Sequence, residues 1–216
     1  MGELNLLDSY PRTKRDLTTR QLATDDDRRL ANAFGQEYFD GSRNQGYGGF
    51  RYDGRWKPVV KRFQEAYGLN SSSRILDVGC AKGFLLHDFR EAIPSVTVEG
   101  IDVSEYALEN AMPDVKPFMH LGNAKKLPYE DKSFDLVIAI NTIHNLELDD
   151  VRTSLREMQR VSRKNSFLIV DAYRNDEERA ALMKWNLTAR TILHVQEWEN
   201  LFRESGYQGD YYWFAP

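Results

Sequence analysis

A chain of 216 residues, 41% of them hydrophobic, can bury one good core but is short for two full domains. Its 29 Lys and Arg against 33 Asp and Glu give a net charge of −4, which excludes a global positive field that would attract nucleic acid or an anionic membrane. No stretch is apolar enough for a secretion signal or a bilayer span, so we expect a cytoplasmic protein without a membrane partner.

Residues 1–69 are expected to form a cap or lid of helices and loops. Thr24 followed by three aspartates has the pattern of a capping box and predicts the start of a helix. The block 37–56 then holds five glycines and six aromatic residues, a composition that favours a compact binding loop over a flexible linker.

The same block is locally basic. Between residues 41 and 62 a single acid, Asp53, accompanies six basic residues, which are Arg43, Arg51, Arg55, Lys57, Lys61 and Arg62. One interpretation is a solvated helix start over a small aromatic core. The functional interpretation is a lid over a ligand, in which Tyr47, Arg51 and Arg55 contact an anionic substrate.

Residues 70–216 are expected to form one α/β domain. Apolar runs at 75–78, 96–101, 117–121, 134–140 and 167–172 alternate with helical patterns, which predicts βαβ units joined into a parallel sheet. The aromatic segment 207–214 is predicted as a last strand that runs antiparallel. The predicted fold is therefore a mostly parallel sheet with an antiparallel C-terminal strand, helices on both faces and an N-terminal cap.

The segment 74–86 runs from a short strand through small residues into an amphipathic helix. Gly79, Ala81 and Gly83 let the backbone come close to a ligand, and the helix start offers unpaired N–H groups to it. A dinucleotide-binding loop would need a third small residue where Phe84 stands, so a pyrophosphate-bearing cofactor is only weakly indicated.

The pattern Asp77-x-Gly79-x-Ala81-x-Gly83 resembles the first motif of class I S-adenosylmethionine-dependent methyltransferases, with Ala81 in place of the usual glycine. The resemblance implies a Rossmann-like methyltransferase sheet, S-adenosylmethionine as the methyl donor and S-adenosylhomocysteine as the product. It also implies that Asp77 interacts with the ammonium group of the donor, while the loop, Cys80 included, surrounds the donor. Cys80 itself is expected to be a small buried residue, since no neighbouring base supports reactivity.

Later motifs resemble the same family in the same order. Asp102 ends the second strand about twenty residues past the glycine loop, where a carboxylate can accept both ribose hydroxyls, and Val103 would lie against the adenine. Asn123 and Ala124 stand in the adenine-edge segment, where an acid is common in the family, and an amide oxygen can still accept from the adenine amino group. The alternative for these residues is an ordinary turn or a helix cap.

The segment 133–146 is similar to the fourth-strand segment of the family, whose end faces the transferred methyl group. Asn141 is expected to form a wall of the donor and acceptor site. His144 follows the strand closely enough to take a proton from the acceptor as a general base. The alternative is a histidine that only hydrogen-bonds Asn145 or the loop backbone. No group of side chains shows the spacing of a metal site.

The resemblance implies methyl transfer to an oxygen or nitrogen atom. Because the chain lacks a basic face or a nucleic-acid module, we expect the acceptor to be a small, anionic metabolite, with a sugar intermediate of a surface polysaccharide as the preferred example. The alternatives are a protein or RNA acceptor, an NAD-dependent oxidoreductase, and a non-catalytic subunit that keeps only the ligand pocket. Nothing in the pattern indicates an oligomeric state.

Overall fold

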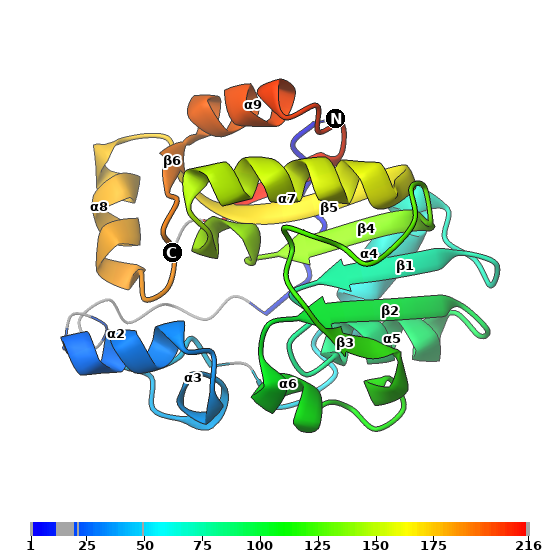
Figure 1. The fold of residues 1–216 in the computed structure, drawn as a ribbon, viewed down its shortest axis with the longest axis horizontal. Helices are drawn as coiled ribbons and strands as arrows, with labels where there is room; N and C mark the ends of the chain where they lie inside the picture. The colour runs from blue at the N-terminus through cyan, green and yellow to red at the C-terminus, as the bar shows by residue number, and fades with distance from the viewer. Residues whose placement is uncertain (1, 12–19, 21, 49, 215–216) are drawn as a thin grey trace.

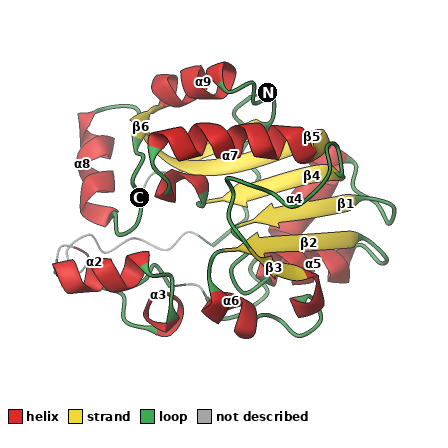
Figure 2. Ribbon diagram, in the orientation of Figure 1, coloured by secondary structure: helices red, strands yellow, loops and turns green. Residues whose placement is uncertain are grey.

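The structure is a computed structural model that describes residues 2–11, 20, 22–48 and 50–214. In this part of the chain a seven-stranded sheet forms the centre of the molecule (Figures 1 and 2). Its strands are β1 (Arg74–Val78), β2 (Thr97–Asp102), β3 (Met119–Leu121), β4 (Phe134–Ile140), β5 (Ser162–Tyr173), β6 (Leu193–His194) and β7 (Asp210–Phe214). The hydrogen-bonded order is β3-β2-β1-β4-β5-β6, and β7 also pairs with β5. The predicted α/β class with a mostly parallel sheet is confirmed.

The predicted direction of the last strand is wrong. β7 pairs in parallel with β5, with Asp210 opposite Phe167 and Phe214 opposite Asp171. The reason lies in the connection between the two strands. β6 pairs near the end of β5, with His194 opposite Tyr173, and α9 (Val195–Glu204) then returns the chain to the level where β5 pairs with Asp210. A long crossover of this kind permits parallel pairing, whereas a hairpin turn would make the last strand antiparallel.

Helices cover both faces of the sheet, as Figure 2 shows. α4 (Lys57–Tyr67) and α5 (Phe84–Ala92) pack on one face, and α7 (Leu148–Val161) and α9 pack on the other. Successive residues of a strand point to opposite faces, so Leu76 and Val78 belong to the core under α7 while Ile75 belongs to the core under α4. Two apolar layers therefore hold the strand ends in fixed positions.

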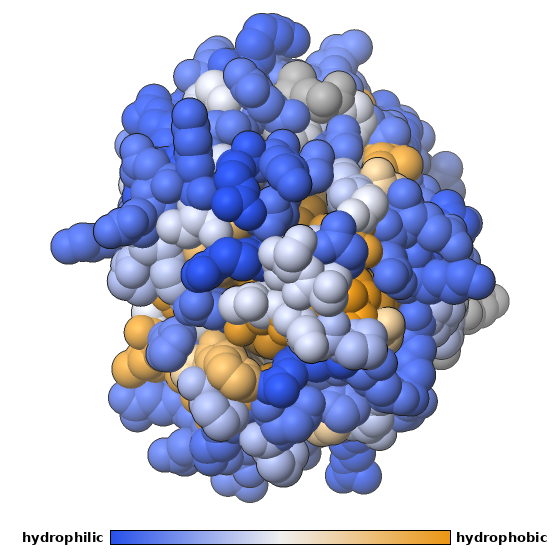
Figure 3. Space-filling model, turned by 90° about the vertical axis from the view of Figure 1, so that its right-hand side faces the viewer, coloured by the Kyte–Doolittle hydropathy of each residue, from blue (hydrophilic) through white to orange (hydrophobic). Residues whose placement is uncertain are grey.

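The described cap consists of α2 (Asp25–Asn32), α3 (Gln36–Asp40) and the loops around them. The predicted capping box is confirmed, because Thr24 Oγ1 accepts from the Asp27 amide at 3.1 Å and the Asp27 carboxylate accepts from the Thr24 amide at 3.0 Å. In Figure 1 the two helices lie beyond the carboxyl ends of the strands, below α8 (Asp176–Trp185). The face of the molecule away from the cap, which is the right-hand side of Figure 1 and is turned toward the viewer in Figure 3, is mostly hydrophilic with small apolar areas.

Three polar contacts attach the cap to the ends of the strands. Ser104, which caps α6 (Glu105–Glu109), donates from Oγ to the Phe34 carbonyl at 2.6 Å. Lys82, in the loop after β1, places Nζ 2.7 and 2.8 Å from the two carboxylate oxygens of Asp40. Tyr106 donates to the same carboxylate at 2.7 Å. The cap is thus bonded to the segments that follow β1 and β2.

The N-terminal segment lies along the outer edge of β7. The Leu4 amide donates to the Tyr211 carbonyl at 2.8 Å, the Tyr211 amide donates to the Gly2 carbonyl at 3.1 Å, and Leu6 is buried in the core beside α4. Two short turns complete the elements, η1 (Lys116–Phe118) and η2 (Ile143–Asn145). Among the described residues no helix has the length and apolar character needed to cross a membrane.

Candidate functional site

The loop between β1 and α5 approaches its neighbours closely. Gly79 has φ +80° and Gly83 has φ +75°, a left-handed conformation that favours glycine. A Cβ atom on Gly79 would overlap the Thr142 side chain, and one on Gly83 would lie 2.7 Å from Met119 Sδ. Ala81 adopts φ +50° despite its methyl group. These positions explain why the sequence has small residues here.

Asp102 is held beside this loop at the end of β2. Its Oδ2 accepts from the Ala81 amide at 2.8 Å, and its Oδ1 accepts from the Ser104 amide at 2.9 Å. Burial raises the pKa of Asp102, while these backbone hydrogen bonds act in the opposite direction. Each carboxylate oxygen has a second lone pair, so the orientation fixed by the loop leaves Asp102 able to accept from a ligand hydroxyl.

Asp77 is buried one strand away, at 5% exposure. Burial, followed by the nearby charge of Asp102, raises the pKa of Asp77 to about 7. Among the described residues no donor hydrogen-bonds the Asp77 carboxyl group, and no basic side chain pairs with it. A buried carboxyl group in this position is electrostatically suited to a cation that comes from outside the chain.

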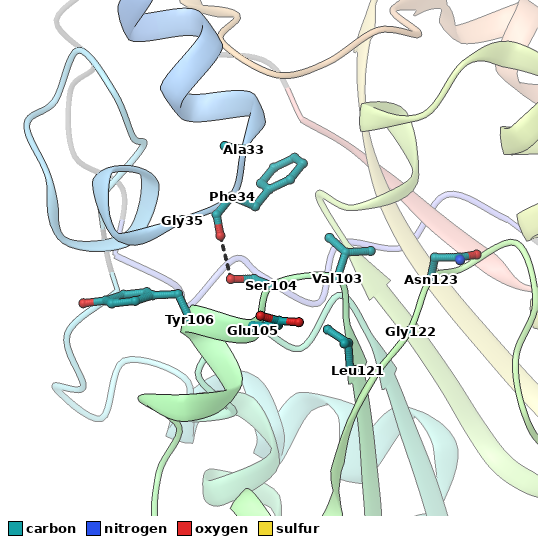
Figure 4. A pocket seen from close by; sticks show the side chains of 10 residues that line it. All are labelled: Ala33, Phe34, Gly35, Val103, Ser104, Glu105, Tyr106, Leu121, Gly122 and Asn123. Atoms are coloured by element: carbon teal, nitrogen blue, oxygen red, sulfur yellow. Dashed lines mark hydrogen bonds between the residues drawn. The ribbon is translucent and has the colours of Figure 1, made fainter.

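A cavity of about 520 Å³ opens between the strand ends and the cap. It is lined by three residues of the α2–α3 loop, by 103–106 and by 121–123. Figure 4 shows Val103, Leu121 and Asn123 on one side of this cavity and Phe34 on the other. Val103 is 54% exposed and Leu121 is 56% exposed, which is unusual for aliphatic side chains at sheet ends and suits a flat apolar ligand.

Of the predicted donor-binding residues, only Val103 and Asn123 line this cavity. Asn123 Oδ1 accepts from the Lys125 amide at 2.9 Å, and Ala124 is buried behind it. Asp77, Asp102 and the glycine loop lie together at the neighbouring strand ends. Asn141 stands at the end of β4 with φ +53°, and its amide donates to the Ile169 carbonyl at 3.0 Å.

His144 is buried in η2, at 5% exposure. Its Nδ1 accepts from the Asp171 amide at 2.9 Å. Burial lowers the pKa of His144, although the charge of Asp171 opposes this effect, so the ring is neutral at pH 7. With the Nδ1 lone pair engaged, the ring proton lies on Nε2, and in this conformation the ring acts as a donor. The general-base role stays a prediction that this tautomer does not favour.

The predicted substrate-binding residues are not gathered in the cavity. Arg55 Nε lies 2.8 and 2.9 Å from the two carboxylate oxygens of Asp53, so its charge already has a partner. Arg51 is exposed. The Tyr47 hydroxyl accepts from the Leu187 amide at 2.7 Å and therefore joins the cap to the loop after α8. Contacts of these residues with a substrate stay a prediction.

Sequence reasoning missed two cap contacts. Lys82 lies between the small residues of the glycine motif, which drew attention away from its charge. A lysine in a buried turn implies a carboxylate partner elsewhere in the chain, and the structure shows that this partner is Asp40. Arg20 lies in a charged N-terminal stretch with no recognisable motif, and yet it is only 2% exposed. Its surroundings depend on Tyr47 and Trp185, which are distant in the sequence, so no local pattern could have revealed it.

On α5, away from this cavity, His87, Asp88 and Glu91 bring ligand atoms within 4.8 Å of one another. Each of the three has another partner. His87 Nδ1 lies 2.8 Å from Asp114, Asp88 accepts from the Tyr52 hydroxyl at 2.6 Å, and Glu91 pairs with Lys57 at 2.8 Å. These contacts account for the cluster without a metal ion.

Comparisons with known proteins agree with the resemblance seen in the sequence. A family model described as a methyltransferase domain matches residues 69–209. The O-methyltransferase resE of Aspergillus sclerotiorum is 28% identical over 185 residues, which cover 74% of this chain and 69% of that protein. A demethylmenaquinone methyltransferase of Staphylococcus aureus is 34% identical over 116 residues, which cover 50% of this chain and 46% of that protein.

Among solved structures, the YcgJ protein of Bacillus subtilis matches with a TM-score of 0.56 at 21% identity, over 68% of this chain and 66% of that one. This likeness shows the shared fold. The chain spans about half to two thirds of the length of the curated relatives it matches.

Proposed function

Because this chain belongs to the class I S-adenosylmethionine-dependent methyltransferases, we propose that it transfers a methyl group from S-adenosylmethionine to an oxygen or nitrogen atom of a small, anionic metabolite. One observation carries the proposal. Asp77, a buried carboxyl group with a pKa raised to about 7, lies at a strand end next to Asp102 and has no protein donor among the described residues. An ammonium group on a nucleoside ligand would supply the missing positive charge.

In this proposal the donor site extends along three strand ends. Asp77 binds the ammonium group, and Asp102 accepts from the ribose hydroxyls. Val103 and Ala124 contact the adenine, and Asn123 accepts from its amino group through the free lone pair of Oδ1. The small residues Gly79, Ala81 and Gly83, with Cys80 between them, allow the backbone to approach the donor. When bound, S-adenosylmethionine supplies the electrophilic methyl group.

The acceptor is proposed to lie beyond β4, where Asn141 forms a wall of the site. The names of two relatives, an O-methyltransferase and a demethylmenaquinone methyltransferase, support a small molecule as the acceptor. The basic and aromatic residues of the cap, with Tyr47, Arg51 and Arg55 as the predicted contacts, support an anionic one. A sugar intermediate of a surface polysaccharide remains the preferred example. The enzyme's main contribution is to align the two reactants in a site without water.

His144 is proposed to act at the methyl-transfer end of this site. As a hydrogen-bond donor it would orient the acceptor through Nε2–H, and as a base it would first have to release the Asp171 amide. In either role we expect His144→Ala to lower turnover more than donor affinity. Turnover and S-adenosylhomocysteine affinity, measured on the same preparation, check this expectation, and unchanged turnover would remove His144 from the reaction.

The proposed function is tested in two steps. Calorimetric titration with S-adenosylhomocysteine should give a saturable heat, and NAD should give no thermal shift. Incubation with an isotope-labelled methyl donor and a metabolite extract should then yield one labelled small molecule, identified by mass spectrometry. Absence of donor binding to folded protein would overturn the assignment. Donor binding without any labelled product across protein, RNA and metabolite acceptors would instead support a non-catalytic role.

A further inference from the structure

Arg20 is a buried cation beside a pair of aromatic rings, Tyr47 and Trp185, that contact each other. Its guanidinium carbon lies 5.1 Å from the ring centre of Tyr47 and 4.8 Å from that of Trp185, and the residue is 2% exposed. Nη2 donates to the Gly46 carbonyl at 3.2 Å. Nε and Nη1 are buried without a hydrogen-bond partner, and within the described residues Arg20 forms no ion pair. Three of the five N–H groups of the guanidinium therefore remain unpaired.

This arrangement is energetically unfavourable for the protein alone. A buried charge normally has a counter-charge and a full set of hydrogen bonds, and two aromatic faces do not replace the hydration of three N–H groups. Burial lowers the pKa of Arg20, yet an arginine side chain stays protonated. Local rules of this kind are broken mainly at functional sites, where a ligand completes the set of contacts.

The charges around Arg20 indicate the sign of the missing partner. Arg28 and Arg43 both act on Arg20 as repelling cations. Arg28 donates to the Asn186 carbonyl at 2.5 Å, a neutral acceptor, and among the described residues neither Arg28 nor Arg43 forms an ion pair. Within the described part of the chain these three guanidinium groups have no carboxylate partner, and together they create a positive region that an oxyanion would neutralise.

Arg20 also lies on the acceptor side of the proposed site. Tyr47, which covers one face of Arg20, is bonded through its hydroxyl to the Leu187 and Thr188 amides. Thr188 Oγ1 in turn contacts Asn145 Oδ1 at 2.9 Å, next to His144. Burial raises the pKa of Tyr38, and the charges of Asp102 and Asp171 raise it further while that of Arg20 lowers it, so Tyr38 is close enough to interact with both the guanidinium and the strand ends.

From these contacts we propose that Arg20 is the receptor for an oxyanion, a phosphate ester or a carboxylate, carried by the methyl acceptor. As to acceptor identity, this inference rests on the proposed function. It replaces Arg55, whose charge is already paired with Asp53, as the main anion contact. Since Nε and Nη1 are buried, side chains around Arg20 must move for the anion to enter.

The test uses two probe anions on the full chain. Inorganic phosphate and acetate are titrated separately into wild-type protein and into Arg20→Met, with and without saturating S-adenosylhomocysteine, at constant ionic strength set with chloride. We expect at least one anion to bind and Arg20→Met to weaken it about tenfold or more, the range for charge-assisted hydrogen bonds. The anion that depends on Arg20 identifies the group. The matched control is Arg62→Met, because Arg62 is a half-exposed arginine paired with Asp8 at 2.7 Å and should leave anion affinity unchanged.

Thermal unfolding separates this role from a structural one. If Arg20 awaits a ligand, Arg20→Met removes an uncompensated charge and the ligand-free protein should unfold at the same or a higher temperature. If the guanidinium only holds the two rings together, the same substitution should lower that temperature. Arg20→Lys keeps the charge but loses the planar fork, so it should bind the anion more weakly than wild type, and it provides a second variant should Arg20→Met not fold.

Equal anion affinity in wild type and Arg20→Met, no binding of either anion to wild type, or a destabilised Arg20→Met without an anion effect would each overturn the proposal. Titration with S-adenosylhomocysteine distinguishes failure of the anion-site proposal from failure of the proposed function. S-adenosylhomocysteine affinity should be unchanged in Arg20→Met, and a wild-type protein that binds phosphate through Arg20 but not S-adenosylhomocysteine would refute the proposed function alone.

Discussion

At the scale of single residues, the surroundings of Asp77 determine when its charge is present. Burial and the charge of Asp102 raise its pKa to about 7, so the neutral acid predominates below that pH. A ligand ammonium group binds the ionised form. We therefore expect S-adenosylhomocysteine affinity to rise on the order of tenfold between about pH 6 and about pH 8, as the carboxyl group ionises. Calorimetric titration across this range checks the prediction.

The matched variant for this measurement is Asp77→Asn. It keeps the shape of the side chain but cannot ionise, so its affinity should be lower at high pH and should vary little with pH. A wild-type profile as flat as that of Asp77→Asn would mean that Asp77 does not bind the ammonium group.

Gly79 gives a second prediction at this scale. Alanine at Gly79 combines an unfavourable φ of +80° with overlap of the Thr142 side chain, and we expect a loss of about 1–3 kcal/mol in unfolding free energy together with loss of donor binding. Gly68→Ala is the control, since it has φ +62° but nothing within 4 Å of the added Cβ. It should cost about 1 kcal/mol and leave donor affinity intact. Urea unfolding and calorimetry of both variants give the comparison.

How much of the site the sequence predicts differs from residue to residue. The glycine loop and Asp102 follow from short local patterns, and the structure brings them together through the hydrogen bond between the Ala81 amide and Asp102. The burial of Arg20 depends on rings from α8 and from the loop after α3, so it is a property of tertiary structure alone. The Nδ1 contact of His144 likewise depends on the Asp171 amide on another strand.

At the scale of elements, the Lys82–Asp40 pair joins α3 to the glycine loop. Both side chains are largely buried, at 8% and 26% exposure, so removing one partner leaves a poorly solvated charge. Lys82→Met should reduce stability by about 2 kcal/mol and speed amide hydrogen exchange in residues 25–40 more than in the sheet. The control is Lys57→Met, whose pair with Glu91 is half exposed and should contribute less than about 1 kcal/mol. Equal amide hydrogen exchange rates of residues 25–40 in Lys82→Met and Lys57→Met would contradict a specific attachment of the cap through Lys82.

The bounds of elements show where local patterns fail. β5 begins at Ser162, five residues before the predicted run at 167–172. The extra residues include Arg163 and Lys164, which do not look like a strand. They extend along the sheet because both pair with the buried Asp135 on β4, at 2.6 and 3.1 Å. A polar partner on a neighbouring strand thus substitutes for the hydrophobic pattern that sequence reasoning requires.

At the scale of the whole molecule, the N-terminal segment completes the edge of the sheet. It pairs with β7 and buries Leu6 to 1% exposure. Deleting residues 1–8 should lower the unfolding temperature, because burial of Leu6 alone contributes about 2 kcal/mol, and should promote self-association through the uncovered edge of β7. Calorimetry and light scattering at several protein concentrations check this expectation. Leu6→Ala is the control, since it should lower stability without uncovering the edge.

The sequence predicts the overall architecture well because strands buried on both faces are nearly continuous in apolar character, as in 136–140. It does not predict the direction of β7. The residue pattern of an aromatic strand does not reveal its direction. The direction of β7 depends on α9, which returns the chain to the starting end of β5 before β7 begins. Strand direction is a property of the connection rather than of the strand.

The single cysteine gives the wild-type chain a natural probe. Cys80 lies inside the glycine loop at 5% exposure, burial raises the pKa of its thiol well above the ordinary value, and its amide bonds the Ile101 carbonyl. A thiol reagent can react only after this loop opens, so the rate of Cys80 labelling measures how often the loop opens. The measurement needs no engineered cysteine, and no other thiol in the chain contributes to the signal. A bound ligand that holds the loop closed would lower the labelling rate of Cys80.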